Sequence, residues 1–350
     1  MPSRISWRPA GKPHPLPGKN WHDLVREEIL EPDLPIIDAH HHIYHRPGLR
    51  YSVDDLMEDV GSGHNIRATV FVDCRAMFRQ DGGEKMAPVG EVEFVNGIAA
   101  MSASGMYGPL RLCAGIVSWA DLTLGAEVGD VLDAQMAAGG TRFRGIRFMT
   151  NWDPDPSLVQ HRMILPERIL YDADFRAGFA QLGPRGLSFD ALVFHPQMQD
   201  LIDLARAFPE TRIVVNHVGG LLAYSRPYAA RRDENIALWR ASMAELARCP
   251  NVFIKLGGRG MPYLGHGFDG KDKPPTSQAL ASSWEQIIRT CIDLFGPDHC
   301  LFESNFPADK PSCSYPVLWN AFKRIAAAYS PEEKQELFYG TAVRAYKLSL

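Results

Sequence analysis

Eight short, almost continuously apolar segments recur along the chain, separated by polar loops and by stretches with helical periodicity. The apolar segments are 34–39, 68–73, 112–118, 143–149, 188–194, 212–216, 251–256 and 300–304. Continuous rather than alternating apolar residues are typical of strands buried on both faces, as in a parallel sheet covered by helices. Helices are predicted at 91–104, 128–138, 175–182, 199–207, 239–247, 283–295 and 331–348. This order predicts an α/β fold, a single (β/α)8 TIM barrel, with a doubly wound open sheet as the alternative.

No repeat or linker divides the chain, so we expect one barrel domain over 31–350 that follows an extended N-terminal arm at 1–30. Three connections that follow strands are long, at 75–90, 150–171 and 257–282. Loops of this length on that side of a barrel commonly line the active site. The third is rich in glycine and is the best candidate for a lid.

Composition and charge exclude several classes of protein. The chain is 45% hydrophobic and 22% charged, which is close to the globular average and argues against a disordered or fibrous protein. Its 37 basic and 41 acidic residues argue against nucleic acid as the partner. It contains neither an apolar segment of about 18 residues, as a membrane helix needs, nor a signal peptide. The six cysteines form no CxxC pair, so we expect buried free thiols and a cytoplasmic location.

The sharpest chemical feature is a run of three histidines at the end of the first predicted strand, in the sequence IIDAHHH. Successive side chains of a strand point to opposite faces, so Asp38, His40 and His42 share one face and His41 points the other way. Two imidazoles at one strand end can bind a single divalent ion, and a nearby carboxylate can orient them. His40 and His42 are therefore candidate metal ligands.

Two further histidines end predicted strands. His195 closes LSFDALVFH and His217 closes RIVVNH, at the strand ends where a barrel builds its active site. One such histidine is more often structural, whereas four that converge on one rim favour a shared site. Structural roles are expected for the remaining histidines considered, which are His41, His45, His64 and His161.

The eighth apolar segment runs into FESNFPADK, in which Glu303 and Asn305 share one face. A carboxylate in an apolar barrel mouth can act as a general acid or base, because burial raises its pKa and a nearby cation lowers it. The alternative is a structural salt bridge from Glu303 to Lys255 or Arg147, and the sequence leaves both interpretations open.

Charged residues also occur within or directly after apolar strands. Lys255 in NVFIKLGG and Arg147 in FRGIRFM should each face a carboxylate, a metal-site ligand or an anionic substrate, because an unpaired buried charge is costly. Arg75, just after FVDC, is a further candidate. Arginine can hold a substrate carboxylate through two parallel hydrogen bonds, so these three residues are predicted to bind substrate.

At these positions the sequence resembles the amidohydrolase superfamily, and within it the amidohydrolase-related TIM-barrel hydrolases that include sugar lactonases and pyrone-dicarboxylate lactonase. The matching motifs run from about residue 35 to 310 and are IDAHHHIYH, FHPQ, VNHVGG, IKLGG and FESNFPADK. The resemblance implies that His40, His42 and His195 bind metal. It also implies that His217 polarises the substrate or binds metal.

The eighth strand departs from the family pattern. Relatives carry an Asp there, often as GSDxP, which binds metal and activates water, whereas this chain has Asn305. An amide cannot act as a carboxylate base, so we hypothesise that Glu303 takes over the acidic role. The fourth strand lacks the bridging lysine of binuclear relatives, so the resemblance implies at most one divalent ion, zinc or manganese. Asn305 leaves metal independence open.

The sequence therefore favours a hydrolase that opens a carboxylated small-molecule lactone. Water would be activated by Glu303 or by a metal, and His217 with the metal or Lys255 would stabilise the carbonyl oxygen. Arg147 and Arg75 would hold substrate carboxylates. Two alternatives remain open: a metal-dependent nonoxidative decarboxylase of an aromatic acid, and a catalytically degenerate barrel that binds a small molecule. The sequence does not determine the oligomeric state, and a homo-oligomer is compatible with it.

Overall fold

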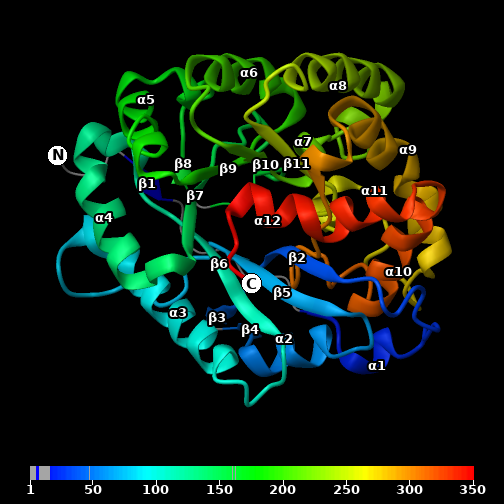
Figure 1. The fold of residues 1–350 in the computed structure, drawn as a ribbon. Coiled ribbons are helices and arrows are strands. Elements are labelled where there is room, and N and C mark those ends of the chain that lie inside the picture. The colour runs from blue at the N-terminus through cyan, green and yellow to red at the C-terminus, as the bar shows by residue number, and fades with distance from the viewer. Residues whose placement is uncertain (1–4, 8–15, 47, 160, 162) are drawn as a thin grey trace.

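The computed structural model describes residues 5–7, 16–46, 48–159, 161 and 163–350. Its centre is a barrel of eight parallel strands, one at each predicted apolar segment (Figure 1). In barrel order the strands are β2 (Ile36–His41), β5 (Ile66–Val72), β6 (Arg111–Ser118), β7 (Phe143–Met149), β9 (Ser188–Leu192), β10 (Ile213–Val215), β11 (Val252–Lys255) and β12 (Cys300–Leu301). The predicted (β/α)8 barrel is confirmed, and the open-sheet alternative is wrong.

Backbone hydrogen bonds between β2 and the segment after β12 close the barrel. The N–H of Asn305 donates to the carbonyl of His40 over 2.8 Å, and the N–H of His42 donates to the carbonyl of Phe306 over 2.7 Å. His41 and Phe306 also pair as in a parallel sheet. The first and last strands are therefore joined at the end of the barrel that carries the histidine run.

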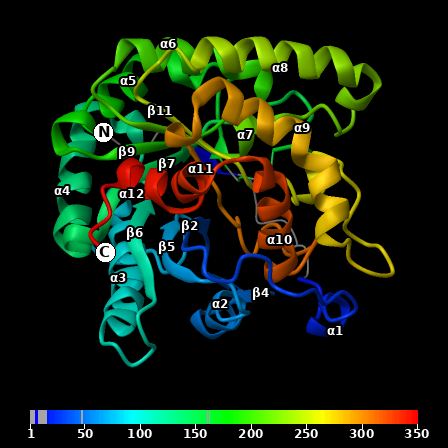
Figure 2. The same ribbon diagram turned by 45° about the vertical axis from the view of Figure 1, so that its right-hand side comes forward.

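Helices surround the strands (Figure 2). The longer ones are α2 (Val53–Val60), α3 (Val89–Ala103), α4 (Val128–Gly139), α5 (Ala173–Phe179), α6 (Met198–Ala207), α8 (Arg232–Leu246), α9 (Ser277–Phe295), α10 (Tyr315–Ile325), α11 (Pro331–Gln335) and α12 (Thr341–Tyr346). Shorter elements are α1 (Lys19–His22), α7 (His217–Gly220), β1 (Ser6–Trp7), β3 (Tyr44–Arg46), β4 (Leu49–Tyr51) and β8 (Met163–Ile164). No helix among the described residues is long and apolar enough to cross a membrane.

The C-terminal helix differs from its prediction. Ser330 caps it through a capping box with Glu333, as the sequence pattern suggests, but the helix is not continuous to residue 348. A π-helical turn at Glu336–Gly340 separates α11 from α12. Helix α10 had no counterpart among the predicted helices, although most of its residues are buried.

Helix α12 seals the end of the barrel opposite the histidine run. Ala342, Ala345 and Tyr346 of this helix are buried in one cluster with strand residues such as Val70 and Val214. Removing these apolar surfaces from water stabilises the barrel.

Within the stretch predicted to be an extended arm, Ser6 and Trp7 of β1 pair antiparallel with β8, and Lys19–His22 form the single turn α1. Residues 1–4 and 8–15 lie outside the described part, so the domain boundary at residue 30 stays a prediction. All six cysteines are buried and free.

The barrel seam depends on a buried carboxylate. Asp38 accepts hydrogen bonds from the backbone N–H of Ser304 (2.8 Å), the hydroxyl of Ser304 (2.6 Å) and the hydroxyl of Tyr315 (3.0 Å). We expect Ser304→Ala to lower the free energy of unfolding by about 1.5–3 kcal/mol, because a charged acceptor loses a donor. Chemical denaturation followed by circular dichroism measures this change.

Ser312→Ala is the matched control, since the buried hydroxyl of Ser312 donates to a neutral acceptor, the carbonyl of Gly260, over 2.6 Å. Its loss should cost only about 0.5–1.5 kcal/mol. Equal destabilisation by the two substitutions would contradict the role assigned to the seam carboxylate.

Candidate active site

Backbone strain is concentrated where strands of the barrel end. His217 and Val218 follow β10 with φ of 55° and 50°, Asn305 follows β12 with φ of 54°, and Arg75 follows β5 with φ of 60°. Left-handed backbone is unfavourable for residues other than glycine, and for a β-branched residue such as valine it is rare. Such strain persists where surrounding structure enforces it, and it clusters at functional sites.

Glu303 joins two histidines from different strands. Its Oε1 lies 2.6 Å from Nδ1 of His217 and its Oε2 lies 2.8 Å from Nδ1 of His40, and the Glu303 and His40 side chains are fully buried. A carboxylate only accepts hydrogen bonds, so the His217 imidazole, which bonds to Oε1 through Nδ1, is best assigned with a hydrogen on Nδ1. This tautomer leaves Nε2 of His217 unprotonated. The contact with His40 has an ion-pair distance without hydrogen-bond geometry, and Oε2 is buried without a hydrogen-bond partner among the described residues.

Nδ1 of His40 faces Glu303, and Nε2 at the opposite edge of the ring faces His42. The Nε2 atoms of the two rings are 3.3 Å apart, and Nδ1 of His42 lies 2.8 Å from the carbonyl oxygen of Val72, which fixes its orientation. Burial holds the pKa values of His40 and His42 far below the usual range, followed by the charge of Lys255 at His40 and the charge of Arg147 at His42. Both rings are therefore neutral, as a metal ligand must be.

The two buried cations are each paired with a carboxylate. Arg147 binds the side chain and carbonyl of Asp73, and its Nη1 faces Nε2 of His40 at 3.2 Å. The ammonium of Lys255 donates to Asp190 over 2.7 Å and lies 3.1 Å from Nδ1 of His40. Each cation thus has a structural partner and also contacts the histidine group.

Asp190 is itself held from two sides. It accepts hydrogen bonds from the amide of Asn216 (3.0 Å) and from the hydroxyl of Tyr346 in α12 (3.0 Å). Asp73 and Asp190 were missed as site residues. The sequence did contain a signal for them, because both are acidic residues within apolar segments. The basic residues Arg147 and Lys255 were recognised by the same kind of signal.

Two adjacent glycines make the close packing of this group feasible. A Cβ at Gly257 would lie 2.2 Å from the carbonyl oxygen of Glu303, and a Cβ at Gly258 would lie 2.0 Å from Nδ1 of His217. Gly258 also has a φ of 69°, which disfavours any other residue. The GG of the IKLGG motif is therefore required by the Glu303–His217 contact.

The side chain of Asn305 takes part in hydrogen bonds that connect it, through Asp309, to the loop containing Gly260. The Asn305 amide donates to Asp309 over 2.8 Å, and Asp309 also accepts from the backbone N–H of Gly260 over 2.7 Å. Burial raises the pKa of Asp309 to about 7. Asn305 lies beside the seam, yet no hydrogen bond joins its side chain to the histidines or to Glu303 among the described contacts. Its predicted catalytic role stays a prediction.

No contact among the described residues joins His195 to the other histidines, and its metal-binding role stays a prediction. Its Nδ1 accepts a hydrogen bond from the backbone of Leu222 over 3.4 Å, and its ring packs edge-on against Tyr228. The group of potential metal ligands found among the described residues contains His40, His217 and Glu303 instead. Arg75 lies with its guanidinium 4.8 Å from the ring centre of Trp119.

The residues present fit one divalent ion better than two. Two nitrogens bound to one tetrahedral zinc lie about 3.3 Å apart, which is the separation of the His40 and His42 Nε2 atoms. Glu303, on the far side of the His40 ring, resembles the carboxylates that orient zinc-binding histidines. Against this, Nη1 of Arg147 points at the same nitrogen, so an ion there would displace that contact.

A barrel of eight parallel strands with histidines, lysine and a carboxylate at the carboxyl ends of its strands defines a TIM-barrel enzyme. The sequence profile of the amidohydrolase family matches residues 37–348, and the chain belongs to this family. It is therefore a hydrolase.

The chain is also similar to individual proteins and to solved structures. The chain is 31% identical over 298 residues to the uncharacterized protein y4mH of Sinorhizobium fredii, covering 85% of this chain and 86% of that protein. It is 29% identical over 243 residues to an L-fucono-1,5-lactonase of Burkholderia multivorans, covering 67% and 72%. A zinc-containing amidohydrolase structure from Burkholderia multivorans shares the fold, with 24% identity, a TM-score of 0.68 and coverage of 90% and 99%.

The geometry predicts how the purified protein responds to zinc. Loaded with excess zinc and desalted, the chain should retain at most one equivalent, and His42→Asn should lower that content severalfold because a neutral imidazole ligand is lost. Elemental analysis measures both values.

His195→Asn is the control, because no described contact joins His195 to the His40–His42 pair, and its loss should leave the zinc content unchanged. Two equivalents per chain, or equal losses in the two variants, would contradict this assignment.

Proposed function

We propose that this protein hydrolyses a small-molecule lactone, and that a His217–Glu303 dyad activates the attacking water. The supporting observation is the pair of buried contacts from Glu303 to Nδ1 of His217 and His40. A histidine whose second nitrogen is held by a carboxylate is the general-base arrangement found in many hydrolases. In this arrangement His217 rather than Glu303 takes the proton, because Oε1 of Glu303 already accepts the hydrogen on Nδ1 of His217.

The proposed reaction begins with a water molecule at Nε2 of His217. His217 takes a proton as the water oxygen attacks the lactone carbonyl, and Glu303 stabilises the imidazolium that forms. Lys255 and Nη1 of Arg147 supply positive charge as the carbonyl oxygen becomes negative. Collapse of the tetrahedral intermediate breaks the ring C–O bond, and His217 returns its proton to the leaving alkoxide.

A divalent ion, where bound by His40 and His42, would supply Lewis-acid polarisation and a more acidic bound water. The histidines, Glu303, Lys255 and Arg147 have the roles described above with or without it. One zinc or manganese ion per chain is therefore part of the proposal, and activity without metal is compatible with it.

The proposed substrate is a polar lactone, which the similarity to L-fucono-1,5-lactonase supports. Arg147 and Lys255 are neutralised by Asp73 and Asp190, so they are less suited to bind a substrate carboxylate than the sequence alone suggests. Recognition of a carboxylate on the lactone would then fall to Arg75. A panel with L-fucono-1,5-lactone, other sugar lactones and carboxylated lactones discriminates neutral from acidic substrates.

The dyad is tested by substitution. We expect Glu303→Gln and His217→Asn each to lower kcat/KM about 10²–10⁴-fold, because each removes the base or its orienting partner. The double variant should lose about as much as either single variant, since the two residues act as a unit. Initial rates of lactone hydrolysis, with circular dichroism to verify folding, measure the effect.

His41→Asn is the matched control, because His41 is a buried histidine of the same strand whose ring faces the hydroxyl of Thr69 at 2.8 Å, away from the dyad. It should retain most of the activity. Full activity of a folded Glu303→Gln variant would refute the dyad. Release of CO₂ from aromatic acids without lactone hydrolysis would favour a decarboxylase, and tight binding without any turnover would favour a binding barrel.

A further inference from the structure

A second concave site lies at the end of the barrel opposite the histidines. It is a hollow of about 420 Å³, within the size range of small-molecule sites. It lies where β7, β9 and β10 begin, next to α4 and the segment after α12. Four of its lining side chains are basic and none is acidic: Arg144, Arg185, Arg212 and Lys347.

Three of these four cations have no carboxylate partner among the described residues. Arg185 pairs with Asp133, with contacts of 2.7 and 3.1 Å. Arg212 instead donates to the carbonyls of Ala345 and Gly186, at 3.0 and 2.7 Å. No ion pair with Lys347 is found in the described part of the chain.

Arg144 is the least satisfied of the group. Its Nη2 reaches only the hydroxyl of Ser349, at 3.5 Å, and its Nε is buried without a hydrogen-bond partner. The cations also repel one another: Arg212, together with burial and Arg144, lowers the pKa of Lys347, and burial lowers the pKa of Arg144. Concentrated positive charge and an unused buried donor are what an anion would satisfy.

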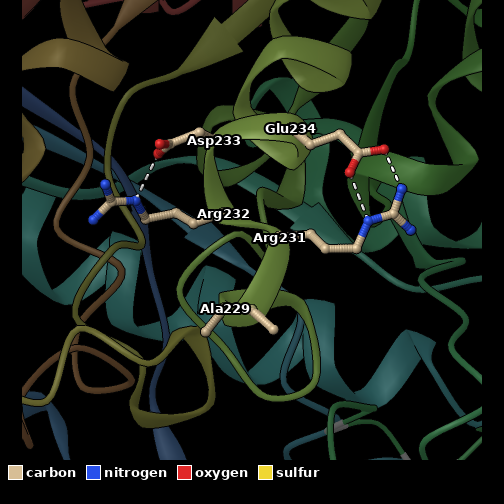
Figure 3. A pocket seen from close by; sticks show the side chains of 6 residues that line it. Ala229, Arg231, Arg232, Asp233 and Glu234 are labelled. Atoms are coloured by element: carbon tan, nitrogen blue, oxygen red, sulfur yellow. Dashed lines mark hydrogen bonds and ion pairs between the residues drawn. The ribbon is translucent and has the colours of Figure 1, made fainter.

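Another hollow on the molecule differs from this one in the charge of its lining. Near the start of α8, a hollow of about 340 Å³ is also lined by two arginines (Figure 3). There Arg231 pairs with Glu234 and Arg232 with Asp233, and these carboxylates belong to the same lining. In that hollow the charges of the two ion pairs cancel, so its lining has no net charge. The hollow at the start of β7, β9 and β10 has a net positive charge instead.

We propose that the hollow formed by Arg144, Arg212 and Lys347 is a binding site for a phosphate group, separate from the active site. Guanidinium groups match the oxygens of phosphate in geometry and charge. Met136, Phe143 and Leu187 also line the hollow, so there is apolar surface for the organic part of a phosphate monoester. This inference does not depend on the reaction proposed for the histidine end.

The test is calorimetric titration of the full chain with inorganic phosphate and, separately, with a sugar phosphate, at fixed ionic strength. We expect both to bind, and the double substitution Arg144→Gln with Lys347→Gln to weaken binding about tenfold or more, since charged hydrogen bonds are lost. These two residues are chosen because, unlike Arg212, they make few structural hydrogen bonds. Tighter binding of the sugar phosphate would identify a phosphorylated metabolite as the ligand, and equal affinity would identify free phosphate.

Arg232→Gln, at the charge-balanced hollow, is the matched control and should leave phosphate binding unchanged. Absence of binding up to about 10 mM phosphate, or equal affinity of the wild type and the double variant, would overturn the proposal. Self-association of the wild type that the double variant abolishes, without phosphate binding, would overturn it in favour of a contact between copies of the chain.

Discussion

The site depends on the contacts that the buried carboxylate of Glu303 makes with the imidazoles of His40 and His217. Without this carboxylate, the Nδ1 hydrogen of His217 would have no acceptor with a full negative charge, and the tautomer of that ring would be free to change. Around this carboxylate the interior keeps an approximate balance of charge, with Asp73 facing Arg147 and Asp190 facing Lys255. Buried charges are tolerated here because they are paired.

The shape of the surrounding loops follows from those contacts. Gly257 and Gly258 have no side chain because Glu303 and His217 occupy the space, and His217 and Val218 adopt left-handed backbone to bring the ring to the carboxylate. Asn305, in the same left-handed region, lets the chain turn while its backbone completes the barrel seam. The cost of these conformations is offset by the packing of a closed barrel.

Sequence reasoning predicted the barrel well, because apolar strands buried on both faces leave a continuous signal at each of the eight positions. It also singled out residues that the structure brings together, since polar residues at strand ends stand out against apolar neighbours: His40, His42, His217, Glu303, Arg147 and Lys255. Their roles stay predictions. Sequence reasoning could not predict which way His195 turns, because its orientation depends on contacts with Leu222 and Tyr228 from a later connection. Nor could it predict that Glu303 would contact both His40 and His217, because those contacts depend on distances between strands far apart in sequence.

The seam between β2 and the segment after β12 has a consequence for folding. His40 and Glu303 belong to the two elements that this seam joins, and the residues between them form the rest of the barrel. A partly folded chain in which the other strands have already paired contains the histidines but no carboxylate between them. Contacts between such distant residues form late, because the entropy of closing the chain must be overcome first. Completion of the barrel therefore also brings His40 and Glu303 together.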